Sequence, residues 1–290
     1  MSELHRTIHF ETLGCRLNQV ESEGAARFFS DAGFPVTMEP FTAKSFDENA
    51  ALCVVNTCTV TAKAEQKARR IIRMLLKTCP NAAVAVTGCY AQLNQKDLLA
   101  IDERICVLGG QHKGSLADVP LLLKNLLAQN PSVDGNAISA EIQKFFDKEN
   151  VSSEPNKITS PFRLSTDTFI NHSRSSLKIQ DGCNCVCTYC RIRLARGKSV
   201  SLAASEVLAR VKALENAGQN EVVITTVNIG QYVSEYEGKR VQFAELLELI
   251  LSQTEKIKIR ISSLYPEIVD EKLASLFENS RVCPYFHISV

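Results

Sequence analysis

The sequence predicts an α/β protein with two domains: an N-terminal parallel sheet flanked by helices, then a second strand–helix series that forms part of a barrel. Two patterns carry this prediction. Short runs rich in β-branched residues alternate with segments whose apolar residues recur at helical spacing, and the alternation starts again after a polar stretch. With 290 residues, 45% of them hydrophobic, the chain is long enough for two cores.

The first alternation, within residues 1–130, predicts the N-terminal domain. Strands are expected at residues 6–14, 51–58, 81–89 and 104–110, and helices at residues 18–33, 63–79 and 115–129. In such a sheet the carboxyl ends of the parallel strands share one edge, where ligands bind. Cys15, Cys58 and Cys89 each stand at the end of a predicted strand. We therefore expect these three distant cysteines to meet at that edge.

Residues 131–172 predict a linker, because they are rich in Ser, Pro, Asn and Thr around one short helical piece at residues 140–150. The second alternation occupies residues 173–290. Its strands are expected at residues 175–182, 221–230, 256–264 and 285–290, separated by helices at residues 201–218, 241–253 and 266–280. Only four barrel strands fit, and an apolar last strand would be an unpaired edge. We therefore expect the chain to be a fragment of a longer barrel.

Composition excludes several classes of protein. The 33 Lys and Arg residues nearly balance the 32 Asp and Glu residues, so any site for a polyanion must be a local patch. No apolar run approaches the ~20 residues that cross a bilayer, and the N-terminus lacks the apolar core of a signal peptide. We expect a cytoplasmic protein with no membrane partner.

Cysteine is unusually frequent, with 11 residues. In a reducing compartment stable disulfides are rare, so unevenly spaced cysteines suggest metal or redox chemistry. Cys53, Cys79, Cys106 and Cys283 have apolar or Pro neighbours and are expected to be small buried apolar residues.

The strongest local motif is DGCNCVCTYC, in which Cys183, Cys187 and Cys190 follow the first predicted strand of the second domain. Three thiolates on one loop can hold three irons of a cubane cluster and leave the fourth iron open. Zinc is the alternative, but a closed zinc site needs a fourth Cys or His, and the sequence has no second CxxC pair. Cys185, at odd spacing from the other three, is expected to point away.

This loop resembles that of the radical S-adenosylmethionine (SAM) enzymes. The resemblance implies that the open iron chelates the amino and carboxylate groups of SAM, and that the reduced cluster generates a 5'-deoxyadenosyl radical. It also implies an electron donor such as a flavodoxin or ferredoxin. Family counterparts of the cluster loop, of ARG, of the NIG strand end and of RISSL imply cofactor contacts for Tyr189, Arg196, Asn228, Gly230 and Ser262.

Three N-terminal motifs, TLGCRLNQVESE, VVNTCTVT and VTGCYAQ, resemble those of the radical SAM methylthiotransferases. The resemblance implies that Cys15, Cys58 and Cys89 bind a second 4Fe-4S cluster. It is closest to the subfamily that adds a methylthio group to C2 of N6-threonylcarbamoyladenosine beside the anticodon. The implied partner is the tRNA anticodon stem-loop. Family members continue through more barrel strands and an RNA-binding domain, so this chain is expected to be too short to act alone.

Other functions remain open at this point. They are methylthiolation of isopentenyladenosine in tRNA or of a protein, a two-cluster electron carrier without catalysis, and an iron–sulfur RNA-binding module. Two basic sets are predicted to contact RNA phosphates. One lies on the helix at residues 63–79, where a solvated face with ion pairs is the alternative, and the other follows the cysteine loop. Their members are Lys63, Lys67, Arg69, Arg70, Arg73 and Lys77, and Arg191, Arg193, Arg196 and Lys198.

Overall fold

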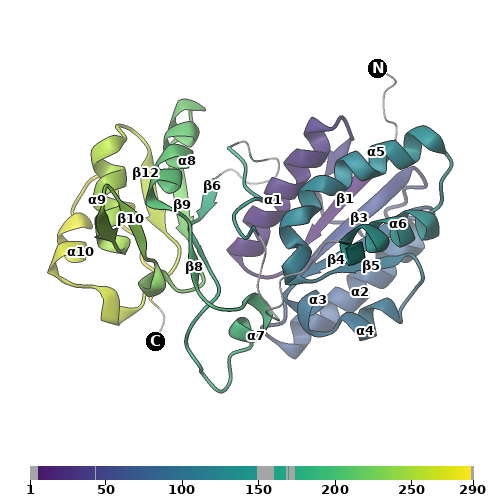
Figure 1. Cartoon of the computed structure of the whole chain (residues 1–290), viewed down its shortest axis with the longest axis horizontal. Coiled ribbons are helices and arrows are strands. Elements are labelled where there is room, and N and C mark those ends of the chain that lie inside the picture. The colour runs from purple at the N-terminus through teal and green to yellow at the C-terminus, as the bar shows by residue number, and fades with distance from the viewer. Residues whose placement is uncertain (1–5, 43, 149–159, 168, 170–173, 289–290) are drawn as a thin grey trace. The chain divides into compact units, whose positions relative to one another are not determined.

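The computed structural model describes residues 6–42, 44–148, 160–167, 169 and 174–288. The chain forms two compact α/β units, each described here by itself (Figure 1). The first unit contains Met1–Leu164 together with Cys187–Arg196, and the second contains Ser165–Val186 and Gly197–Val290. The second half of the cysteine loop therefore packs with the N-terminal unit.

The first unit is built on a sheet of five parallel strands in the order β2-β1-β3-β4-β5. The strands are β1 (Thr7–Thr12), β2 (Val36–Thr37), β3 (Ala50–Thr57), β4 (Ala83–Gly88) and β5 (Ile105–Leu108). Every residue of β3, β4 and β5 is buried, which explains why they read as continuous apolar runs. Four of the five strands agree with the sequence prediction. The edge strand β2 is only two residues long and has no sequence pattern.

Helices cover both faces of this sheet (Figure 1). One face carries α1 (Arg16–Asp31), α5 (Val119–Gln129) and α6 (Gly135–Lys148), and the other carries α2 (Ala62–Thr78), α3 (Cys89–Leu93) and α4 (Gln95–Leu99). Thr61 is the N-cap of α2, and its hydroxyl accepts the N–H of Ala64. The helix buries Ala68, Ile72 and Leu75 at helical spacing. The helix predicted from residue 115 starts later, because a 3₁₀ turn, η1 (Gly110–Asp118), precedes α5.

Helix α6 corrects the prediction that the linker starts at residue 131. Its side chains Ile138, Ile142 and Phe146 are four residues apart and are fully buried in the same core as α1 and α5. The helical piece predicted at residues 140–150 belongs to this helix, but the turn-forming residues on either side led to its assignment to the linker. The N-terminal unit consequently extends to Leu164, while residues 149–159, 168 and 170–172 of the predicted linker lie outside the described part of the chain.

The second unit contains three parallel strands in the order β12-β9-β6. They are β6 (Ser175–Lys178), β9 (Glu221–Thr225) and β12 (Lys258–Ile261), connected through helices α8 (Ala204–Asn216) and α9 (Phe243–Gln253) and followed by η3 (Pro266–Ile268) and α10 (Glu271–Leu276). Two short antiparallel pairs were not predicted: β7 (Gln180–Asp181) with β8 (Val200–Ser201), and β10 (Ser234–Tyr236) with β11 (Lys239–Val241). None of the described helices is long and apolar enough to cross a bilayer.

The fourth barrel strand, expected at residues 285–290, stays a prediction, because residues 289 and 290 lie outside the described part of the chain. Residues 285–288 form one isolated bridge, between Ile288 and Leu264. A second parallel bridge joins Val282 to Ile259 within β12, so the stretch before residue 285 also pairs with that strand. The described part of this unit thus has three parallel strands where four were expected.

We predict that α6 stabilises the N-terminal unit. The change Phe146→Ala should lower the free energy of unfolding by about 3–5 kcal/mol, because it empties a fully buried aromatic site. Denaturant unfolding followed by circular dichroism measures the change. The exposed Lys144, on the same helix, is the control, and Lys144→Ala should stay within about 0.5 kcal/mol of wild type. Equal stability of the two variants would contradict a structural role for α6.

Candidate functional site

Three cysteines stand where adjacent strands of the N-terminal sheet end. Cys15 is the N-cap of α1 beyond β1, Cys58 directly follows β3, and Cys89 opens α3 directly after β4. Strands β1, β3 and β4 are neighbours and parallel, and Thr57 pairs with Gly88, so Cys58 and Cys89 leave the sheet side by side. These positions are the carboxyl edge on which the sequence analysis placed them.

Two glycines allow the close approach of these turns. Gly14 has φ +102°, and a Cβ on it would lie 2.6 Å from the Cβ and 2.9 Å from the Sγ of Cys58. Gly88 has φ +96°, and a Cβ there would collide with the backbone of Thr57 and come within 2.6 Å of Asn56 Oδ1. Only glycine fits at both positions without strain.

The electrostatics of Cys58 also indicate that the three thiols are neighbours. Burial raises the pKa of the Cys58 thiol, the nearby Cys89 and Cys15 raise it further, and the backbone N–H groups of Val60 and Thr59 oppose the shift. Cys58 and Cys89 are buried, whereas Cys15 is exposed. The first triad, Cys15, Cys58 and Cys89, thus has two buried thiols and one thiol open to solvent.

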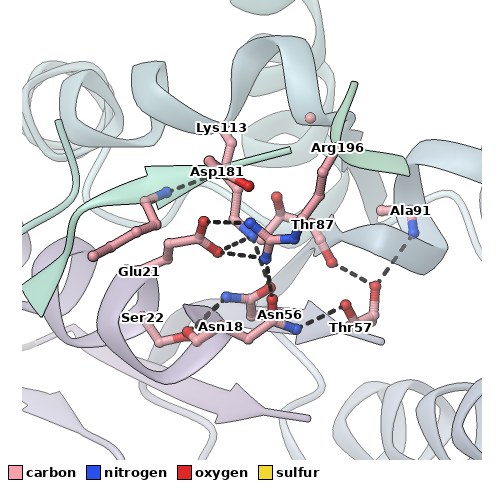
Figure 2. Close-up of polar contacts among 12 residues, drawn as sticks. Asn18, Glu21, Ser22, Asn56, Thr57, Thr87, Ala91, Lys113, Asp181 and Arg196 are labelled. Atoms are coloured by element: carbon pink, nitrogen blue, oxygen red, sulfur yellow. Dashed lines mark hydrogen bonds and ion pairs between the residues drawn. The ribbon is translucent and has the colours of Figure 1, made fainter. Parts of the chain in front are cut away.

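A buried polar network joins α1 to β3, Lys113 and Arg196 (Figure 2). Glu21 on α1 accepts a hydrogen bond from Arg196 at 3.0 Å and forms an ion pair with Lys113. Asn18, one turn before Glu21, accepts from Arg196 at 2.7 Å and donates to the carbonyls of Leu13 and Thr57 at 2.7 and 3.0 Å. Sequence reasoning did not identify Glu21 or Lys113. The sequence did hold one signal for Glu21: its carboxylate stands at helical spacing from Asn18, on a helix that faces the core.

The second triad, Cys183, Cys187 and Cys190, lies on a loop whose two halves belong to different units. In the second unit, the N–H of Cys183 donates to the carbonyl of Gly197 at 3.1 Å. In the first unit, Cys187 and Cys190 form a tight turn in which the Cys190 N–H donates to the Cys187 carbonyl at 3.1 Å. Arg191 then pairs with Glu65 of α2 at 2.7 Å. Helix α7 (Ile192–Arg196) follows.

Cys185 does not point away from the loop, contrary to the sequence expectation. The side-chain amide of Gln231 lies 3.2 Å from the Sγ of Cys185 and 3.6 Å from that of Cys183. Both thiols therefore face one amide donor. The odd sequence spacing of Cys185 does not turn its side chain to the opposite side, because residues 184–190 form an irregular loop without the alternation of a strand.

Gln180 is a further residue that sequence reasoning missed. Its side chain is completely buried; Nε2 donates to the carbonyl of Gly182 and to Ser199 Oγ, each at 2.7 Å. Its Oε1 accepts from the N–H groups of Val227 and Asn228 at 3.0 Å. Gln180 thereby connects the start of the cysteine loop to the turn beyond β9.

The predicted cofactor residues occupy different surroundings. Tyr189 is 88% exposed on the loop. Asn228 caps η2 (Ile229–Gln231) by accepting the N–H of Gly230, and Ser262 is half-buried just beyond β12. Both Asn228 and Ser262 are at the carboxyl ends of strands in the second unit. Arg196 is 5% exposed, and its guanidinium is bonded to Glu21 and Asn18. Its predicted contact with the cofactor stays a prediction.

The donor set of each triad, three thiolates, fits an iron–sulfur cluster, which binds each thiolate on a different iron. Within the described residues, no group of three or more Cys, His, Asp or Glu side chains is arranged to hold a metal ion. The four cysteines expected to be structural are all buried, as predicted. Burial raises the pKa of the Cys106 thiol to about 12 against the opposing effect of a backbone hydrogen bond, which keeps this thiol protonated and inert.

Two family models match the chain. Residues 7–110 match the uncharacterized protein family UPF0004, and residues 177–290 match the Radical SAM superfamily. The two models fall on the sheet that carries the first triad and on the region that starts with β6 and the cysteine loop. The fold and the matches together define a radical SAM protein with an N-terminal UPF0004 domain.

Curated relatives narrow this class. The chain is 42% identical to the Threonylcarbamoyladenosine tRNA methylthiotransferase MtaB of Treponema pallidum, and the alignment covers 98% of this chain and 65% of that protein. It is 31% identical to the protein of the same name from Bacillus subtilis, over 98% of this chain and 57% of that one. Over nearly its whole length, the chain is similar to the radical SAM methylthiotransferases. It spans less than two thirds of the length of these relatives.

Solved structures support the fold. The radical S-adenosylmethionine methyltransferase TsrM from Kitasatospora setae matches with a TM-score of 0.53 at 13% identity, over 98% of this chain and 59% of that one. The cobalamin-dependent S-adenosylmethionine radical enzyme OxsB matches with a TM-score of 0.54 at 11% identity, over 94% of this chain and 41% of that one. At such low identity the likeness concerns the fold alone.

We predict that Gly88 is essential for the turn that carries Cys89. The change Gly88→Ala should lower the free energy of unfolding by about 2–5 kcal/mol, because it adds a clash with Thr57 to an unfavourable φ. Gly33→Ala is the matched control, since Gly33 has φ +91° but nothing within 4 Å of the added Cβ. The control should cost only about 1–2 kcal/mol. Equal losses in chemical denaturation would show that crowding at Gly88 is unimportant.

Proposed function

We propose that the protein is a tRNA methylthiotransferase that uses SAM and two 4Fe-4S clusters to add a methylthio group to C2 of N6-threonylcarbamoyladenosine. The observation that carries the proposal is the meeting of Cys15, Cys58 and Cys89 at one sheet edge, in addition to the radical SAM loop. A radical SAM protein that only generated a radical would need no second cysteine triad. A tRNA substrate would place the reaction in the cytoplasm.

Each triad would have its own task. When bound, the clusters and SAM would supply the electron, the radical, the sulfur and the methyl group. Cys183, Cys187 and Cys190 would hold the cluster next to SAM, and Cys15, Cys58 and Cys89 would hold the other. The amide of Gln231 would orient the loop by donating to the thiolate of Cys183. The exposed ring of Tyr189 would be free to stack on a purine base.

The described contacts change which cations can hold RNA. Arg69 donates to Tyr90, Arg191 pairs with Glu65, and Arg196 is buried against Glu21. The exposed cations of α2 form no ion pairs among the described residues, and we call them the α2 stripe: Lys63, Lys67, Arg70, Arg73 and Lys77. The stripe starts just beyond the turn of Cys58. We propose that it contacts phosphates of the tRNA, with Arg193 and Lys198 as further candidates.

The function is tested by mass spectrometry of tRNA nucleosides from a strain that lacks the gene. The wild-type gene should restore the methylthio form of N6-threonylcarbamoyladenosine. Genes with either triad changed to Ala should restore none. The purified variant with Cys15, Cys58 and Cys89 changed should still release 5'-deoxyadenosine from SAM under anaerobic reduction. The variant with the radical SAM triad changed should not.

Other outcomes of that experiment would identify a different function. Loss of the methylthio group from isopentenyladenosine alone would identify that nucleoside as the substrate. No change in any tRNA nucleoside would exclude tRNA and favour methylthiolation of a protein. If the wild-type protein releases no 5'-deoxyadenosine, the remaining functions are an electron carrier and an RNA-binding module.

The α2 stripe makes a separate prediction about RNA binding. The triple variant Lys63→Glu, Arg70→Glu, Lys77→Glu should weaken binding of the anticodon stem-loop at least about tenfold. In the plot of log binding constant against log salt concentration, the magnitude of the slope should also fall by about 2–3, which is close to one for each lost phosphate contact. Fluorescence anisotropy at several salt concentrations measures both quantities.

The control for net charge lies in the second unit. Lys239, Arg240 and Lys256 are exposed and form no ion pairs among the described residues. Changing these three to Glu alters the net charge equally but should leave the salt slope unchanged. The same slope in both triple variants would assign the effect to net charge and contradict a specific stripe.

A further inference from the structure

The segment after the cysteine loop is held by one arginine. The Arg196 guanidinium donates through Nη1 to Glu21 Oε1 at 3.0 Å and through Nη2 to Asn18 Oδ1 at 2.7 Å. A further bond runs from Nη2 to Glu21 Oε2 at 3.3 Å. Arg196 is the last residue of α7, which belongs to the N-terminal unit together with Cys187 and Cys190. The arginine therefore fixes the carboxyl end of the segment that carries these two cysteines.

One carboxylate serves two cations in this network. Glu21 is 2% exposed, and Lys113 and Arg196 are each 5% exposed. Lys113 is paired with Glu21 and also donates to Asn56 Oδ1 at 3.2 Å. Because charges buried from water are costly unless paired, loss of the carboxylate would remove a counter-charge from both cations.

The same polar groups support the first triad (Figure 2). Asn18 donates to the carbonyls of Leu13 and Thr57, which lie just before Cys15 and Cys58. Asn56 donates to the carbonyl of Asn18 at 2.9 Å and to Ser22 Oγ at 3.1 Å. Thr57 donates through its hydroxyl to the Thr87 carbonyl, two residues before Cys89. One connected set of hydrogen bonds thus reaches the turns of all three cysteines.

We propose that Glu21 and Arg196 are a pair of positioning residues that fix Cys187 and Cys190 on the polar support of Cys15, Cys58 and Cys89. Arg196 acts on these cysteines through the segment that its guanidinium holds against Glu21 and Asn18. The inference rests on the proposed function in one respect, the binding of clusters by these cysteines. It assigns a structural cause to the joint presence of a carboxylate on α1 and an arginine far along the chain.

Hydrogen exchange on the metal-free chain tests the pair without any cofactor. The variants are Glu21→Gln, which keeps the shape and removes the charge, and Arg196→Lys, which keeps the charge and loses the planar fork. In both, the amides of Cys190 and Ala195, which donate within the segment, should exchange about tenfold or more faster. The amides of β4 should exchange as in wild type. Arg193→Lys, on the same helix, is the matched control and should leave all of these rates unchanged.

Iron content gives a second measurement that does not depend on turnover. With Cys15, Cys58 and Cys89 changed to Ala, both Glu21→Gln and Arg196→Lys should reduce the iron retained after anaerobic reconstitution and gel filtration, and Arg193→Lys should not. With the other triad changed to Ala instead, Glu21→Gln should still reduce the iron retained. Arg196→Lys should have the smaller effect there, because Asn18 keeps its bonds to Leu13 and Thr57.

The results separate this inference from the proposed function. If wild type retains no iron at either triad, the proposed function fails while the exchange measurement still tests the pair. Wild-type exchange at Cys190 and Ala195 in both variants would overturn the inference. Equal acceleration of exchange in β4 would also overturn it, because Glu21 and Arg196 would then only stabilise the unit as a whole.

Discussion

The arrangement of the N-terminal unit depends on the parallel alignment of three neighbouring strands, β1, β3 and β4. Parallel pairing places their carboxyl ends at one edge, so residues separated by long stretches of chain become neighbours without any contact of their own. The pairing of Thr57 with Gly88 brings Cys58 and Cys89 out of the sheet together. Glycine at residues 14 and 88 is then required, since the turns approach too closely for a side chain.

The second constraint is electrostatic. Two buried cations, Lys113 and Arg196, share the carboxylate of Glu21. Three buried charges add little to the free energy of folding, because the cost of desolvating them opposes the attraction between them. A packed apolar cluster would fill the same space at lower cost. The charged groups instead fix the orientation of the Arg196 side chain, since a planar guanidinium bonded to both Glu21 and Asn18 fits only one geometry. The network is therefore better explained by placement of the cysteine turns than by stability.

Sequence patterns predicted the structural features that depend on residues close together in the chain. The strands β3, β4 and β5 and the helix α2 were found because apolar periodicity is local, and the buried state of Cys53 and Cys106 followed from their strand neighbours. The place of α6 in the core and the partner of Arg196 were not found. The contact of Arg196 with Glu21 joins residues 175 positions apart, and no pattern within one segment encodes such a contact. Short strands such as β2 and β10 fail for a related reason, because two or three residues hold no period.

The two triads differ in a way that suits different tasks. In the first, two of three thiols are buried, and burial and the neighbouring thiols raise the pKa of Cys58. Three thiolates so placed repel one another, so the arrangement favours a cationic group that binds all three at once. In the second, Cys187 and Tyr189 are exposed on an irregular loop, where a diffusing cofactor or substrate can reach them. One triad with two buried thiols and another on an open loop would suit the proposed division of tasks, in which the first supplies a group and the second receives small molecules from solution.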